Sequence, residues 1–107
     1  MGPDRTPTRW GMAMARFQQG RFAEVVVLAR QLLHTSDNPT AYALLAASLG
    51  HLGQSTAGAE ALAGYWRHTP QPLDAYARVT WRDPARRKLF LDGVALAGAK
   101  VGAGSEA

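Results

Sequence analysis

Two glycines organise most of this chain. Gly20 and Gly53 lie 33 residues apart, and an apolar helical pattern precedes each of them. Glycine readily takes the left-handed backbone conformation that ends a helix, and after both glycines the apolar pattern starts again within a few residues. The sequence therefore predicts two helix–turn–helix units in tandem, each with an apolar face that only a neighbour can cover.

The spacing of the apolar residues predicts where the helices lie. Intervals of three and four place one set on a single helix face: Trp10, Ala13, Met14 and Phe17. This predicts a first helix from Thr8 or Arg9 to Gln19. A second helix begins near Phe22, where three consecutive valines favour a strand but the length and period of the segment favour a helix.

Further helices are expected downstream of this unit. They cover about 39–51 and 55–68, a short piece over 73–80, and a last segment that begins at Pro84 and stops near Gly98. Asn38 or Thr40 is expected to cap the third helix, with Pro39 in its first turn, and Asp83 is expected to cap the last one. The last segment carries apolar residues with which to cover the exposed end of the second unit: Leu89, Phe90 and Val94.

The residues of the second unit resemble the tetratricopeptide repeat (TPR) family. The matching positions are Tyr42, Leu45, Ala46, Leu49, Gly53, Gly58 and Pro70. In the first unit Gly20 and Phe22 match, whereas Val25 replaces the usual alanine, Arg16 a common tyrosine and Asp37 the closing proline. The resemblance covers about residues 9–70. It implies an all-α fold, an α-solenoid of two TPR-like helical hairpins plus a C-terminal capping helix.

This interpretation divides the chain into three parts. Residues 1–8 are expected to be a flexible lead and residues 99–107 a disordered tail. Between them, residues 9–98 form a single helical domain, with repeats at about 9–37 and 39–70 and a capping segment at 73–98.

The resemblance also implies a function, protein–protein interaction through a concave groove lined by the first helix of each unit. The candidate partner-binding groove consists of Trp10, Met14, Phe17, Gln18, Thr40, Ala43, Ala47, Gly50 and His51. The small residues at 43, 47 and 50 are expected to leave a shallow channel, suited to an extended peptide or a partner helix.

The C-terminal segment carries a second resemblance. The pattern is similar to the end of bacterial TPR regions attached to class III adenylate/guanylate cyclases and to winged-helix regulators, and it comprises Arg82, Asp83, Pro84, Phe90, Leu91, Gly93, Ala97 and Gly98. A cyclase domain does not fit in 107 residues, so this resemblance implies an accessory module without catalysis.

A basic segment overlaps this pattern. The net charge of +4 is concentrated in a candidate basic patch of Arg78, Arg82, Arg86, Arg87 and Lys88. A solvated helix face is the simpler interpretation of the patch. The alternatives to peptide binding are a regulatory or nucleic-acid-associated accessory domain that uses this segment, and a self-association module. The moderate total charge makes nucleic acid an unlikely partner.

Catalytic and metal chemistry find little support. The chain has no cysteine, and its serines lack a nucleophile motif, so no enzymatic activity and no cofactor are expected. His34, His51 and His68 recur at equal intervals, but they fall near the ends of different helices, which favours solvated or capping roles over zinc ligation.

The three tryptophans are expected to pack in the core or in caps, with an exposed interface anchor as the alternative.

The remaining expectations concern location and assembly. No apolar run is long enough for a transmembrane helix, and "MGPDRTPTRW" lacks the apolar region of a secretory signal, so a cytoplasmic protein without membrane contact is expected. The first helix carries more large apolar residues than one hairpin partner can cover. This surplus predicts a homodimer through the first helix or the groove.

Overall fold

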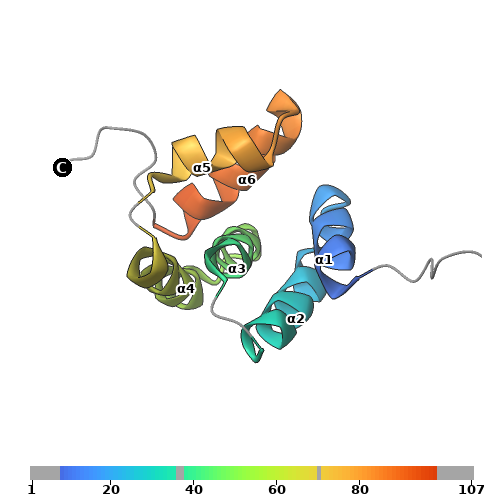
Figure 1. Ribbon diagram of the computed structural model, residues 1–107, viewed down its shortest axis with the longest axis vertical. Coiled ribbons are helices and arrows are strands. Elements are labelled where there is room, and N and C mark those ends of the chain that lie inside the picture. Colours follow the sequence, from blue (N-terminus) through green and yellow to red (C-terminus); the bar gives the residue numbers. More distant parts are fainter. Residues whose placement is uncertain (1–7, 36–37, 70, 99–107) are drawn as a thin grey trace, which may run out of the picture.

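The residues that the structure describes form six α-helices. The computed structural model describes residues 8–35, 38–69 and 71–98, and these residues contain no strand (Figure 1). The helices are α1 (Arg9–Gln18), α2 (Phe22–Leu33), α3 (Pro39–His51), α4 (Ser55–His68), α5 (Leu73–Thr80) and α6 (Pro84–Leu96). The all-α prediction is confirmed. Apart from Thr8, the predicted lead 1–8 and the whole of the predicted tail 99–107 lie outside the described residues.

Both predicted glycine turns are present and have nearly the same geometry. Gly20 has a φ of 76° and Gly53 a φ of 78°, in the left-handed region that side-chain-bearing residues avoid. In each turn the residue after the glycine donates its backbone N–H to the carbonyl five positions earlier, over 2.9 Å. This hydrogen bond satisfies a carbonyl at the end of the helix that no intrahelical donor reaches. The same turn thus occurs twice, 33 residues apart.

Side chains cap the N-termini of three helices. The Thr8 Oγ1 accepts a hydrogen bond from the backbone N–H of Gly11 over 2.9 Å and caps α1. Asn38 Oδ1 caps α3 at 2.8 Å and Asp83 Oδ1 caps α6 at 3.0 Å. Each cap satisfies a backbone donor that the first turn of a helix leaves unpaired. Of the two candidates for α3, Asn38 is therefore the cap.

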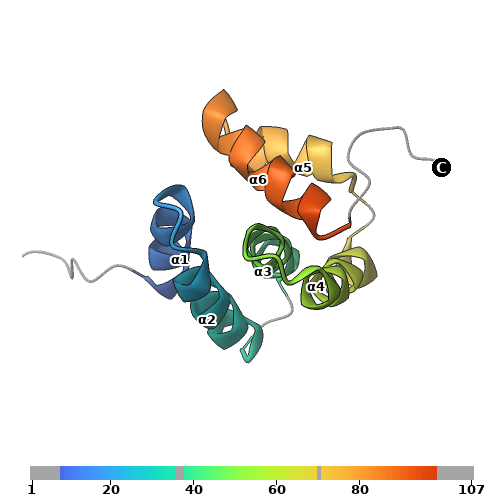
Figure 2. The ribbon, with the colours of Figure 1, turned by 180° about the vertical axis from the view of Figure 1, so that it is seen from behind.

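Helix α3 lies at the centre of the fold. It packs against α2 on one side, α4 on another and α6 on a third (Figures 1 and 2). All residues from Ala43 to Gly50 are buried. A helix that is apolar all round is a buried helix, and no charged residue occurs from Asn38 to Gly50.

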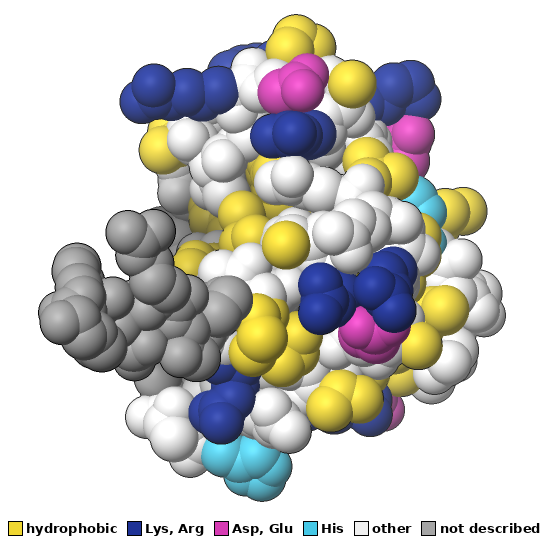
Figure 3. Space-filling view, turned by 90° about the vertical axis from the view of Figure 1, so that its right-hand side faces the viewer, with side chains coloured by type: hydrophobic (Ala, Val, Ile, Leu, Met, Phe, Trp, Pro, Cys, Tyr) yellow, Lys and Arg dark blue, Asp and Glu magenta, His cyan; other side chains and the backbone are white. Residues whose placement is uncertain are grey.

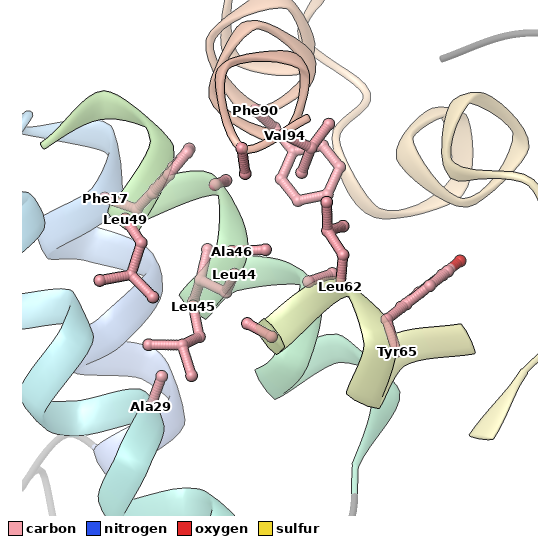
Figure 4. Packing of buried hydrophobic residues seen from close by; sticks show 14 of the residues in the cluster. Phe17, Ala29, Leu44, Leu45, Ala46, Leu49, Leu62, Tyr65, Phe90 and Val94 are labelled. Atoms are coloured by element: carbon pink, nitrogen blue, oxygen red, sulfur yellow. The ribbon is translucent and has the colours of Figure 1, made fainter. Parts of the chain in front are cut away.

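The last two helices do not extend the row of hairpins beyond α4. Helix α5 packs on α6, and α6 folds back over α3, between α1 and α4 in Figure 1. Phe90 and Val94 are buried, as the sequence predicts, and Figure 4 shows them extending from α6 next to Leu62. The surface that α6 covers is chiefly that of α3, whereas the sequence analysis expected it to cover the end of the second unit.

Candidate functional site

The predicted groove is occupied by helix α6. Phe17, Ala43 and Ala47 have no exposed surface, and Gly50 is buried as well. These residues of α1 and α3 were expected to contact a partner. In this arrangement Phe17, Ala47 and Gly50 contact the chain's own C-terminal helix and Ala43 is buried, so no open channel exists at positions 43, 47 and 50.

Two glycines allow α6 to approach α3 closely. A Cβ atom on Gly50 would overlap the carbonyl oxygen of Gly93, and a Cβ atom on Gly93 would lie 2.5 Å from the carbonyl oxygen of Ala47. The backbones therefore meet where neither helix carries a side chain. The small residues of α3 were expected to suit an extended peptide or a partner helix, and the helix they accommodate belongs to the same chain.

His51 anchors α6 from the end of α3. Its Nε2 donates a hydrogen bond to the carbonyl oxygen of Leu89 over 2.7 Å, and its ring stacks on Phe22 with centroids 4.4 Å apart. A carbonyl can only accept, so Nε2 carries the proton. His51 is thus a structural contact between α3, α2 and α6.

The other predicted groove residues are less buried. Trp10, Met14 and Thr40 are half-buried and Gln18 is exposed. Met14 and Gln18 face the turn between α5 and α6, where they line a small cleft. This cleft is the part of the predicted groove that α6 leaves open.

We call this feature the α1–α5 cleft. Its volume is about 260 Å³, and it is lined by Met14, Gln18, Val79, Thr80, Trp81, Arg82, Asp83 and Arg86. It brings two predicted groove residues together with Arg82 and Arg86 of the predicted basic patch. From the sequence, these two sets were expected to form separate surfaces.

The chemistry of the α1–α5 cleft is mixed. Val79 is 74% exposed and Met14 half-buried, so apolar surface is accessible. Arg82 and Arg86 are exposed, and the Asp83 carboxylate lies 3.6 Å from the Arg86 guanidinium. On the face seen in Figure 3, hydrophobic side chains lie between an upper and a lower group of basic ones. Apolar contact beside cations suits a ligand that is both apolar and acidic.

Trp81 forms the inner wall of the cleft. It is 3% exposed and lies among aromatic rings, with centroids 5.4 Å from Phe17 and 6.0 Å from Phe90. Its Nε1 has no hydrogen-bond partner among the described residues. Buried indole N–H groups are normally paired. Sequence reasoning assigned Trp81 to packing and did not single out Val79.

The basic patch is less uniform than its sequence suggests. Arg87 is half-buried, and its guanidinium donates to the carbonyl oxygens of Trp81 and Arg82, over 3.0 Å in both cases. Lys88 pairs with Asp92 over 2.8 Å on the exposed side of α6. Arg78 is exposed on α5. Arg87 therefore holds the end of α5, and opposite charge neutralises part of the patch.

The three histidines lie apart from one another. His34 is exposed at the end of α2, and His68 of α4 stacks on Tyr42 with centroids 5.5 Å apart. Within the described ranges, no three histidine or acidic side chains gather as metal ligands. The helices of the same ranges are too short or too polar to cross a membrane.

Two buried tyrosines lie in contact between α4 and α5. The Tyr65 hydroxyl donates to the carbonyl oxygen of Gln71 over 2.8 Å, and its ring lies edge-on to Tyr76 at 5.7 Å. Burial, together with the neighbouring Tyr76, raises the pKa of Tyr65 to about 12. Burial also raises the pKa of Tyr76. This pair joins α4 to α5 and serves the fold.

Comparison of the chain with protein-family models, with curated proteins and with solved structures finds no match.

Proposed function

We propose that the protein is a non-catalytic protein–protein interaction module that binds a short acidic and apolar peptide segment in the α1–α5 cleft. The observation that carries this proposal is the meeting of Met14 and Val79 with Arg82 and Arg86 around one cavity of about 260 Å³. Apolar contacts supply affinity, and the two arginines select carboxylates.

The TPR-like character of the module belongs to the same proposal. It is supported by the repeated glycine turn, by the pairing of α1 with α2 and of α3 with α4, and by the sequence positions that match the family. Because α6 lies where the groove of such repeats would bind a partner, the binding surface moves to the open end of that groove.

The size of the cleft decides which form of ligand fits. A cavity of about 260 Å³ is small for a drug-sized ligand, and α6 already fills the channel that would take a helix. An extended peptide needs only pockets for individual side chains. We therefore favour an extended segment with one apolar residue next to one or two carboxylates.

Nucleic acid is the alternative partner for the basic patch. A phosphate-binding surface needs several free cations on one face. Arg87 donates to backbone carbonyls and Lys88 is paired with Asp92, so both are poorly placed for this role. The peptide proposal uses the arginines where they adjoin apolar surface.

The test is a selection from a random peptide library displayed on phage, using the immobilised full chain. We expect the selected peptides to combine an apolar residue with Asp or Glu, and we measure their affinity by fluorescence polarisation. Val79→Asp and Arg82→Glu should each weaken binding at least tenfold, or about 1.4 kcal/mol. Val27→Asp is the control, because Val27 is also exposed, at 55%, but lies on α2 outside the cleft.

Two results would contradict the proposal. One is that no peptide is enriched. The other is that enriched peptides bind the Val79→Asp and Arg82→Glu variants as tightly as the wild type.

A further inference from the structure

The outer face of α4 has no helix beside it. Helix α4 packs on α3 through a buried side that comprises Gly58, Ala61, Leu62, Gly64 and Tyr65. Because α5 and α6 fold back over α3, no described helix covers the opposite side (Figures 1 and 2). That side, which we call the α4 face, exposes Ser55, Thr56, Ala59, Glu60, Ala63, Trp66 and Arg67.

The α4 face contains both a depression and a projecting side chain. A shallow depression of about 600 Å³ is lined by Ser55, Thr56, Ala59, Glu60, Ala63, Ala97 and Gly98. Trp66 lies one turn further along and is 44% exposed, although tryptophan is usually well buried. An exposed tryptophan beside a pocket of small residues is typical of an interface anchor and its receptor site.

The residues of the α4 face lie along its middle and along two edges of different chemistry. Ala63 lies at the middle, since it is one turn from both Ala59 and Trp66. Helical spacing puts Ala59 and Trp66 along one edge of the face. The same spacing puts Glu60 and Arg67, two turns apart, along the other edge. One edge is therefore apolar and the other carries one charge of each sign.

We infer that the α4 face binds the α4 face of a second copy of this chain, with the two helices antiparallel about a twofold axis near Ala63. A twofold axis perpendicular to both helices keeps like edges together. Trp66 then lies against the partner's Ala59, in the depression. On the other edge, Arg67 meets the partner's Glu60.

Charge complementarity identifies a second copy as the occupant. Neither Glu60 nor Arg67 forms an ion pair with another described residue. In the antiparallel pairing, Glu60 of each copy lies next to Arg67 of the other copy, so the dimer contains this ion pair twice. A parallel pairing about a twofold axis along the helices would instead set the charged edge against the partner's apolar edge and leave both charges unpaired. Helix α4 thus supplies the anchor, most of the receptor site and both charges of a self-complementary contact.

The extent of the α4 face sets the strength of the dimer. The helix has 14 residues, so one helix pair is a small contact compared with the interfaces of about 1,200–2,000 Å² that stable complexes bury. A weak dimer is expected, with monomer and dimer exchanging at micromolar concentration. The α4 face shares no residue with the α1–α5 cleft, so this inference does not depend on the proposed peptide binding.

This dimer differs from the one expected from the sequence. That expectation rested on a surplus of large apolar residues on α1. In the structure Phe17 is fully buried, and Trp10, Met12 and Met14 are half-buried. The largest exposed aromatic residue on the described surface is instead Trp66, on α4.

The experiment is sedimentation equilibrium of the full chain from micromolar to millimolar concentration, combined with charge reversal. We expect a concentration-dependent dimer for the wild type. Glu60→Arg alone, Arg67→Glu alone and Trp66→Ala should each raise the dimer dissociation constant at least tenfold. The double variant Glu60→Arg/Arg67→Glu should return it to within about threefold of the wild-type value, because each pair is restored with exchanged charges.

Circular dichroism and thermal melting establish that each variant folds, and Val27→Asp serves as a surface control. Rescue by the double variant distinguishes this contact from a general effect of charge on association. A wild-type chain that stays monomeric throughout, or a double variant that associates no better than the single ones, would overturn the inference.

Discussion

The two helical hairpins share a turn but differ in what surrounds them. In both, the glycine φ and the turn hydrogen bonds are nearly identical. Helix α1 lies at the edge of the fold, with Arg9 and Gln18 exposed, whereas α3 is enclosed by three helices. Local sequence thus produces the same hairpin twice, and position in the fold decides how much of each first helix is buried.

Equivalent positions show the difference most clearly. Phe17 and Gly50 both lie three residues before the turn glycine. Phe17 fills the space between α1 and α6 with a large ring, while Gly50 supplies no side chain and lets the backbone of α6 come close. The first hairpin therefore contacts α6 through a large side chain. The second contacts it through the backbone, because Gly50 has no side chain.

The largest expected effect is at Phe17. Phe17→Ala should destabilise the protein by about 3–5 kcal/mol, because it leaves a cavity among Phe22, Trp81 and Phe90. Urea unfolding followed by circular dichroism measures this loss. Val27→Ala is the matched control, since Val27 is exposed, and a similar loss in both variants would contradict the central position of Phe17.

Gly50→Ala should also destabilise the protein, but by adding volume where Phe17→Ala removes it. Alanine favours a helix over glycine by about 1 kcal/mol, but the added methyl group overlaps the carbonyl oxygen of Gly93. Overpacking typically costs about 1–3 kcal/mol, so we expect a net loss of stability. A variant that melts at a higher temperature than the wild type would show that α6 does not cross α3 at this point.

The two turn glycines should respond equally. A Cβ atom at either Gly20 or Gly53 would meet nothing within 4 Å, so a substitution there tests the backbone conformation alone. Gly20→Val and Gly53→Val should each cost about 1–2 kcal/mol, the strain of a left-handed residue with a side chain. Thermal melting of the two variants makes the comparison. Unequal losses would mean that the turns are equivalent in shape but not in their share of the stability.

The smallest effect concerns alkaline pH. The first hairpin has no tyrosine, whereas the second carries Tyr65, whose pKa is raised to about 12. Above pH 10 the unfolded chain releases the phenolic proton while the folded chain retains it. Stability therefore falls as the pH rises, by about 1 kcal/mol for Tyr65 between pH 9 and 10.5. Urea unfolding at the two pH values checks this, and Tyr65→Phe should reduce the dependence on pH.

Local features of the fold could be predicted from the sequence. The helix boundaries near Thr8, Asn38 and Asp83 follow from side chains that cap backbone groups within three residues. The turns at Gly20 and Gly53 follow from the conformational freedom of glycine. The boundaries predicted for α2 to α6 agree with those observed, because each depends on interactions that span only a few neighbouring residues.

The candidate site could be predicted only in part. Met14, Gln18, Arg82 and Arg86 were identified, but as members of two separate surfaces. The absence of charge from Asn38 to Gly50 was a signal that α3 has no solvent-facing side, and it could have shown that the groove at Ala43 and Ala47 is covered.

What the sequence by itself determined is therefore the set of helices, their caps and the two turns, since short-range hydrogen bonds and backbone preferences decide them. The tertiary structure decided where α6 lies. Phe90 and Val94 require burial, but an apolar helix face satisfies that requirement against any complementary surface, and both α3 and the outer side of α4 offered one. The close fit of Gly93 against Gly50 selected α3. That choice closed the groove, left the α1–α5 cleft open at its edge and kept the α4 face exposed.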